Sequence, residues 1–234
     1  LESGRAALSA GACDAGLDCL RRAGAQAESA GDDALLARCL YELGSALVHA
    51  VRGFDDEGTL LLGQAVQLAR TAGDMPTAVS ALRERGYADA LAGRRPEAQR
   101  HLDLAGDLAA DDAGLCAGVH AIAGFHLADW GRLDEGLARY QLAIDCARQA
   151  GDRRREAWAL GIGAWALLAA GRVPEAVRWV TDSLTIVQDL RWVSFEPWPA
   201  SVLAEAALAD GGAGTASPAD LERCFALSCQ LDDP

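Results

Sequence analysis

The side chains that could bind a metal or act in catalysis are four histidines and seven cysteines. His120 and His126 stand six residues apart, so on a helix they point to different faces and cannot form the i, i+4 pair that holds zinc. The metalloprotease motif HExxH, the hydrolase motif GxSxG and Cys-x-x-Cys pairs do not occur in the sequence. We therefore predict no catalytic residues, no metal site and no cofactor, and we do not expect an enzyme.

The cysteines are typical of a reduced protein interior rather than of a disulfide framework. Their odd number and irregular spacing favour small core residues of a cytoplasmic protein: Cys13, Cys19, Cys39, Cys116, Cys146, Cys224 and Cys229. We find no signal peptide and no apolar run long enough to cross a bilayer. The sequence thus predicts a soluble, cytoplasmic chain with no membrane partner.

The charge of the chain argues against phosphate-containing partners. The formal net charge is −13, and all 21 basic residues are arginine. Without lysine the chain cannot contain the phosphate-binding loop GxxxxGK[ST]. An acidic surface repels nucleic-acid backbones, so we expect no direct nucleic-acid binding by this segment.

The sequence repeats with a period of about 40 residues, and these repeat units must position any functional side chains of the chain. Glycines expected in turns recur with nearly equal spacing, at Gly11, Gly53, Gly93, Gly131, Gly171 and Gly212. After Gly131, apolar residues recur at steps of three and four (Leu137, Tyr140, Ile144), which predicts an amphipathic helix. We expect an all-α fold of about twelve helices in antiparallel pairs, with no strands.

The expected repeats cover approximately 1–32 (with a truncated first helix), 33–74, 75–112, 113–152, 153–190 and 191–234. Asp33, Asp74 and Asp152 are expected to cap helix N-termini. Gly136 is expected where its helix approaches a partner closely, and the segment from Trp192 to Pro199 is expected to be the rigid start of a helix. Neither end shows a polar capping face, so we expect 1–234 to be one array and a fragment of a larger protein.

The turns share a sequence pattern, seen as GRRPEA from Gly93, GRLDEG from Gly131 and GRVPEA from Gly171. Small residues recur in each second helix, at Gly16, Gly58, Ala98, Gly136 and Ala176. This pattern resembles the tetratricopeptide-repeat (TPR) family, which implies a solenoid of helix pairs with a right-handed superhelix. The period and the Ala-Gly-Asp boundaries are similar to repeat regions of large bacterial LuxR-type ATPase regulators and actinobacterial antibiotic-regulatory activators. That similarity implies an ATPase module and a DNA-binding module elsewhere in the parent protein.

Two polar residues occupy positions that are apolar in the other repeats. His120 stands where the other repeats have leucine, and we interpret it as a hydrogen-bonded core histidine rather than a functional one. Asp89 stands where Leu47, Leu127 and Leu167 occur, so it is either a buried carboxylate or the result of a one-residue shift in register.

The first helices of TPR-like pairs line a concave groove, and an aromatic series falls on the face expected to point there. Tyr87, Phe125 and Trp165 follow one another at the spacing of the repeat. Tyr41 and Arg83 lie one turn earlier on the same face, and Trp158 lies in the first turn of the last of these helices. Such residues suit a partner helix, peptide or small ligand. The alternative is that the rings fill space between adjacent helices.

Two functional hypotheses remain for a chain with no expected catalytic or nucleic-acid-binding role. The first is a non-catalytic binding scaffold, the sensor or coupling segment of a multidomain bacterial transcriptional regulator. Its partner would be another protein, a peptide, a domain of the parent chain or a small-molecule effector. The second is self-association, for example as a homodimer. In it the apolar helix at 157–170, whose side with Trp158 and Trp165 would otherwise be bare, and the uncapped ends of the array pair with another copy. Arg153, Arg154 and Arg155 at the start of this helix could hold an acidic partner or form a solvated first turn.

The charge argument yields a direct test. Because electrostatic attraction supplies most non-specific DNA affinity, the acidic chain is expected not to bind random duplex at physiological salt. Fluorescence anisotropy of a labelled duplex measures this, and a dissociation constant in the micromolar range would contradict the prediction.

Overall fold

The computed structural model describes residues 1–9, 12–49, 55–209, 222, 225–226 and 229. Within these residues the chain forms eleven α-helices and no strand, which confirms the predicted all-α fold. The last helix of the twelve expected falls in 210–234, nearly all of which lies outside the described residues. The helices are α1 (Glu2–Ser9), α2 (Cys13–Ala30), α3 (Asp33–His49), α4 (Asp55–Ala72), α5 (Met75–Leu91), α6 (Arg95–Ala109), α7 (Ala113–Asp129), α8 (Leu133–Ala150), α9 (Arg153–Ala169), α10 (Val173–Asp189) and α11 (Pro197–Ala209).

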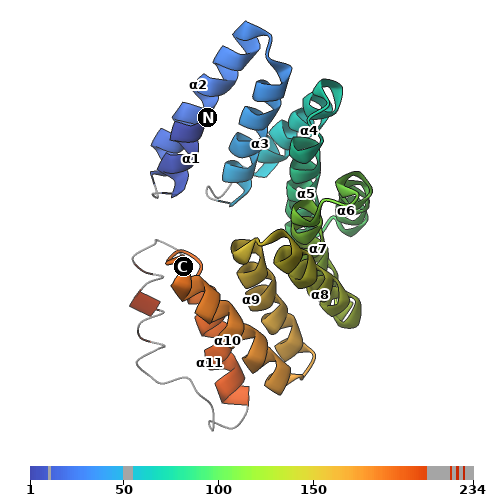
Figure 1. The fold of residues 1–234 in the computed structure, drawn as a ribbon, viewed down its shortest axis with the longest axis vertical. Coiled ribbons are helices and arrows are strands. Elements are labelled where there is room, and N and C mark those ends of the chain that lie inside the picture. Colours follow the sequence, from blue (N-terminus) through green and yellow to red (C-terminus); the bar gives the residue numbers. More distant parts are fainter. Residues whose placement is uncertain (10–11, 50–54, 210–221, 223–224, 227–228, 230–234) are drawn as a thin grey trace. The chain divides into compact units, whose positions relative to one another are not determined.

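The chain forms two compact units, Leu1–Leu115 and Cys116–Pro234. In the first unit α1 packs on α2, α3 on α4 and α5 on α6, and each pair also contacts the next (Figure 1). In the second unit α9 packs on α8 and α10, and α11 packs on both α9 and α10. Helix pairs begin at Asp33, Met75, Ala113 and Arg153, close to the expected repeat starts.

Left-handed glycines end the helices at the predicted turns. Gly93, Gly131 and Gly171 have φ values of 73°, 83° and 72°, a conformation that glycine adopts without steric cost. The other three turn glycines of the prediction, Gly11, Gly53 and Gly212, lie outside the described residues. At the last boundary a non-glycine residue, Arg191, takes the left-handed conformation with φ of 50°.

Aspartates start the helices, with one correction to the prediction. Asp74 and Asp152 accept hydrogen bonds from the backbone N–H groups of residues three positions later, over 3.3 and 3.0 Å. For α3 the capping residue is Asp32, whose Oδ1 accepts from the Leu35 N–H, and not Asp33. Asp33 is already the first helical residue, because the cap is the residue that directly follows the left-handed glycine, as Asp74 follows Gly73 and Asp152 follows Gly151.

Small residues let the two helices of a pair touch backbone to backbone. A Cβ atom added at Gly136 of α8 would lie 2.9 Å from the Ala128 nitrogen and 2.9 Å from the Gly124 carbonyl oxygen of α7. The Tyr140 ring, which is fully buried, fits the space left by Gly124. Across the next interface a Cβ atom at Gly163 of α9 would lie 3.2 Å from the same ring. The expected close approach at Gly136 is confirmed.

Two expectations about individual side chains need adjustment. Among the six described cysteines only Cys39 is buried, four are half-buried and Cys229 is exposed, so the prediction of core cysteines was wrong for most of them. His120 is half-buried, and its Nδ1 lies 3.3 Å from Nη1 of Arg139. Burial, followed by the nearby Arg139 charge, lowers the pKa of His120.

Among the helices that the structure describes, none has both the length and the apolar character needed to cross a membrane.

The Gly136 contact predicts a large penalty for a bulky side chain. Gly136→Leu should lower the free energy of unfolding by about 1–3 kcal/mol, because the added atoms meet backbone that cannot move aside. Urea denaturation followed by circular dichroism measures the change. Ala138→Leu, on the exposed face of the same helix, should have little effect. Equal midpoints for Gly136→Leu and the unchanged chain would show that the helices do not touch there.

Candidate binding surfaces

In the first unit, two of the predicted binding residues are hydrogen-bonded to each other. Arg83 on α5 donates from Nη2 to the hydroxyl of Tyr41 on α3 over 3.3 Å. The same guanidinium donates to Glu84 from both Nε and Nη2, over 3.1 and 2.5 Å. Burial raises the pKa of the Tyr41 hydroxyl, so it stays protonated at neutral pH. These contacts join the first helices of two successive repeats.

Glu84 is the centre of this cluster, and the sequence prediction did not include it. Its carboxylate is buried, and its Oε2 lies 2.6 Å from Nε2 of His49. The His49 ring stacks on Tyr87 at 4.8 Å between ring centroids and 17° between planes. Burial acts to raise the pKa of Glu84, but the Arg83 charge and the His49 hydrogen bond outweigh it and lower the pKa to about 2. Glu84 is therefore ionised at neutral pH.

A usable signal for Glu84 was present in the repeat pattern. The positions equivalent to Glu84 in the two following repeats are Ile122 and Ile162, whereas the preceding repeat has Glu42, which is itself paired with Arg5. A carboxylate at an apolar register position indicates a buried ion pair, as it does for Asp89, since an unpaired buried charge is very costly.

In the second unit the predicted aromatic residues lie at the edge of the core. Phe125, Trp158 and Trp165 are half-buried and pack against a buried cluster that includes Tyr140 and Leu160. Trp165 also packs against a second cluster of Ala164, Val180 and Val202. Each ring thus has one side in packing contacts while part of its surface stays accessible.

A small cleft lies beside Trp165. Its volume is about 140 Å³, and its walls come from α9 and α11, which are first helices of successive repeats. The lining residues are Trp165, Leu168, Ala169, Glu205 and Ala209. The aromatic ring on one wall and the carboxylate on the other match the chemistry of an apolar group that carries a hydrogen-bond donor or positive charge.

The six predicted residues thus form two groups in two units. Tyr41, Arg83 and Tyr87 belong to the first unit and are linked through Glu84 and His49. The other group, in the second unit, consists of Phe125, Trp158 and Trp165. A single groove containing all six remains a prediction.

The three arginines at the start of α9 all have partners inside the chain. Arg153 lies 3.2 Å from the Asp189 carboxylate and Arg155 lies 3.1 Å from the Asp152 carboxylate. The guanidinium of Arg154 lies over the Trp192 ring, 4.8 Å from its centroid. These contacts favour the interpretation as a solvated first turn over a site for an acidic partner.

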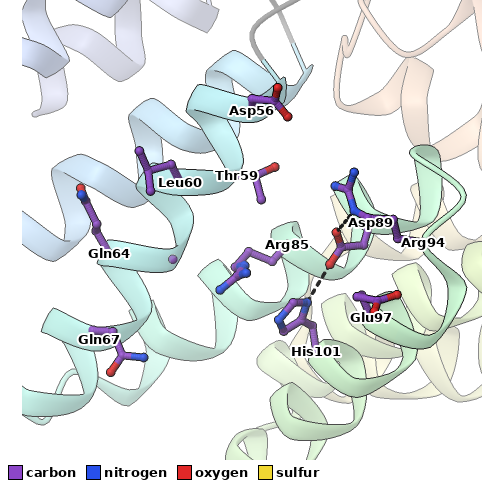
Figure 2. A pocket seen from close by; sticks show the side chains of 11 residues that line it. Asp56, Thr59, Leu60, Gln64, Gln67, Arg85, Asp89, Arg94, Glu97 and His101 are labelled. Carbon is purple, nitrogen blue, oxygen red and sulfur yellow. Dashed lines mark hydrogen bonds and ion pairs between the residues drawn. The ribbon is translucent and has the colours of Figure 1, made fainter.

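A second cleft in the first unit has polar walls. It measures about 680 Å³ and lies between α4, α5 and α6 (Figure 2). Asp89 of α5 is buried here and accepts from Arg94 Nε at 2.7 Å, while its other oxygen lies 2.8 Å from His101 Nδ1. Asp89 is thus a true buried carboxylate, and not a shift in register. Burial and the nearby Arg85 charge lower the pKa of His101, against the opposing effect of Asp89.

Side chains that ligate metals stay apart in the described part of the chain. Within those residues, no three histidine, cysteine, aspartate or glutamate side chains come together in a way that could hold a metal ion.

Comparison with solved structures identifies the fold. The crystal structure of BtubC (BKLC) from P. vanneervenii superposes with a TM-score of 0.67 at 15% identity, over 92% of this chain and 89% of that one. The TPR-like repeats of a putative kinesin light chain from Podosopora anserina give a TM-score of 0.56 at 18% identity, over 83% and 94%. A point variant of those repeats gives 0.59 at 19%, over 84% and 96%. No protein-family model and no curated protein matches the sequence.

These likenesses confirm the predicted TPR-like helical-repeat fold. At 15% to 19% identity they concern the fold alone, and the function must be argued from the surfaces of this chain.

The Glu84 cluster predicts a specific acid sensitivity. The pKa of Glu84 falls from 4.5 to about 2 on folding, so its contribution to stability is complete above pH 4.5 and is lost as the pH falls toward 2. Glu84→Gln should therefore lower stability at pH 7 by about 3 kcal/mol, since Arg83 stays buried without its counter-ion. It should also flatten the pH dependence in that window.

Urea midpoints measured between pH 7 and pH 2 check both effects. Glu135→Gln, which changes the same charge at an exposed position, is the control and should keep the pH dependence. If the two variants gave the same pH profile, the Glu84 pair would not be a stabilising element.

Proposed function

We propose that this chain is a non-catalytic scaffold that binds a polypeptide on the face formed by its first helices. The observation that carries the proposal is the cleft between α9 and α11, where the half-buried Trp165 forms a wall. A TPR-like array places successive first helices side by side, and tryptophan is enriched among residues that anchor protein interfaces. Glu205 on the opposite wall supplies a charge that would orient a basic or amide group beside the ring.

A polypeptide fits this cleft better than a small effector does. With a volume of about 140 Å³ it is smaller than the pockets of roughly 300–1,000 Å³ that enclose drug-sized ligands. It can hold one side chain, and the affinity of a peptide would come from several such contacts along the face.

The wider context of the proposal rests on the sequence. The repeat period and the Ala-Gly-Asp boundaries resemble those of repeat regions in LuxR-type and actinobacterial regulators. We propose that the chain is the sensor or coupling segment of such a cytoplasmic regulator. Its partner would then be another protein or a domain of the parent chain.

Self-association is the second candidate, and exposed apolar side chains near α11 favour it. Leu208 is 77% exposed, Val193 46% and Trp198 41%. Exposed large apolar side chains can pair with a second copy. Light scattering distinguishes the two functions: a dimer mass that reverts to the monomer in Trp198→Arg would favour self-association, and a monomer mass for the unchanged chain would favour the scaffold.

The Trp165 cleft gives the decisive binding test. Peptides are first selected on the chain from a display library, and the affinity of the best peptide is measured by calorimetry. Trp165→Ala should weaken binding by about 2 kcal/mol, which is roughly 30-fold, because an interface anchor is lost. The same change should cost less stability than the roughly 3–5 kcal/mol of a core tryptophan, because the ring is only half-buried.

Trp130→Ala is the matched control, since Trp130 is 44% exposed and lies at the turn after α7. It should keep peptide affinity. A Trp165→Ala variant that binds normally but unfolds more readily would show that the ring is a packing residue and would exclude the proposed anchor.

A further inference from the structure

The Trp165 cleft contains one charged side chain, the exposed Glu205 of α11. Of the described residues, no arginine lines this cleft, and none forms a hydrogen bond or ion pair with Glu205. The arginines at the start of the facing helix α9 are engaged elsewhere, Arg153 with Asp189 and Arg155 with Asp152. The carboxylate is therefore open to a cation that a partner brings.

Glu205 continues the aromatic series of the first helices. Arg191 before α11 takes the left-handed conformation that Gly151 takes before α9, with φ of 50° and 68°, so the two helices correspond at a spacing of 40 residues. The buried alanines of the two helices fall at the same spacing: Ala164 and Ala166, Ala204 and Ala206. At this spacing Glu205 is the counterpart of Trp165, which itself follows Phe125 by 40 residues. The carboxylate thus belongs to the same helix face as the rings.

A second place in the chain shows how a tryptophan and a glutamate hold an arginine. The guanidinium of Arg132 lies over the Trp130 ring, 5.3 Å from its centroid, and its Nε donates to the Glu135 carboxylate over 2.7 Å. A planar guanidinium can lie on an aromatic face and donate to a carboxylate at the same time, whereas the ammonium of lysine is a compact point charge. The Trp165 cleft presents the same two groups, the ring from α9 and the carboxylate from α11.

The size and the remaining walls of the cleft also match an arginine. A volume of about 140 Å³ accommodates the end of one side chain. The apolar lining residues suit the methylene stem behind a guanidinium: Leu168, Ala169 and Ala209. The net charge of −13 favours a basic partner over an acidic one.

We propose that the Trp165 cleft binds an arginine side chain of the partner polypeptide, which lies on the Trp165 ring and pairs with the Glu205 carboxylate. This inference rests on the proposed function, because it names the side chain that the bound polypeptide places in the cleft. The partner is accordingly a basic segment.

NMR of ¹⁵N-labelled protein tests the site with the blocked tripeptide N-acetyl-Gly-Arg-Gly-amide as the probe. The indole N–H signal of Trp165, assigned by its loss in Trp165→Ala, should shift saturably with a dissociation constant of roughly millimolar, as expected for so small a ligand. The same tripeptide with citrulline keeps the shape of arginine without its charge and should bind roughly five-fold more weakly or worse. Equal affinities of the two tripeptides, or tighter binding of a lysine tripeptide, would overturn the proposal.

Glu205→Gln should reduce the affinity for the arginine tripeptide to that for the citrulline tripeptide. Because Glu205 is exposed, the urea midpoint should not change, so the loss does not reflect unfolding. Asp182→Asn is the matched control, since it removes an equal charge from an exposed position on α10, outside the cleft. It should keep the preference for arginine. An equal loss in both variants would assign the preference to the overall charge of the chain and overturn the site.

Peptides selected from the display library separate this inference from the proposed function. A loss of affinity when one arginine is replaced by citrulline, seen in the unchanged chain but not in Glu205→Gln, supports the arginine site. A peptide that depends on Trp165 but has no arginine, or keeps its affinity with citrulline at each one, would overturn the arginine site and leave the proposed function standing. Peptides that bind Trp165→Ala as tightly as the unchanged chain would contradict both.

Discussion

The close approach of the two helices within each pair is the constraint on which the structure depends. In the pair α3–α4, a Cβ atom at Gly44 or at Gly58 would lie 2.9 Å from the carbonyl oxygen of the other glycine. Real Cβ atoms do not tolerate such distances, so small residues must recur at these positions. Because the helices touch there, the neighbouring large side chains interlock around the contact, as Leu62 does with Gly44.

This constraint explains why the architecture could be predicted from the sequence. Positions such as Gly136 and Gly131 are restricted by backbone geometry, which depends little on the rest of the molecule. The position of Asp89 in the repeat indicated a buried carboxylate as one of two interpretations, but its partners Arg94 and His101 could not be read from the spacing. Side-chain pairs of this kind form across turns and between helices, where rotamers and not the period decide which groups meet.

The interaction partners of Glu84 could not be predicted from the sequence for the same reason. Arg83 was predicted as a groove residue, but it pairs with the buried carboxylate of Glu84, which also contacts the exposed His49 ring. A charged residue on a helix has several possible neighbours, and burial decides among them because an unpaired charge cannot stay inside.

The two units differ in the kind of side-chain contacts that they contain. The described side chains of the first include the buried ion pairs around Glu84 and Asp89, whereas aromatic rings packed on an apolar cluster dominate the second.

Amide hydrogen exchange of the chain with and without a selected peptide tests the central claim most directly. Binding on the first-helix face predicts slower exchange in α9 and α11, whose residues form the Trp165 cleft, and little change in α10 on the other side of the pair. Protection confined to α10, with α9 and α11 unchanged, would contradict the claim that this face receives the partner.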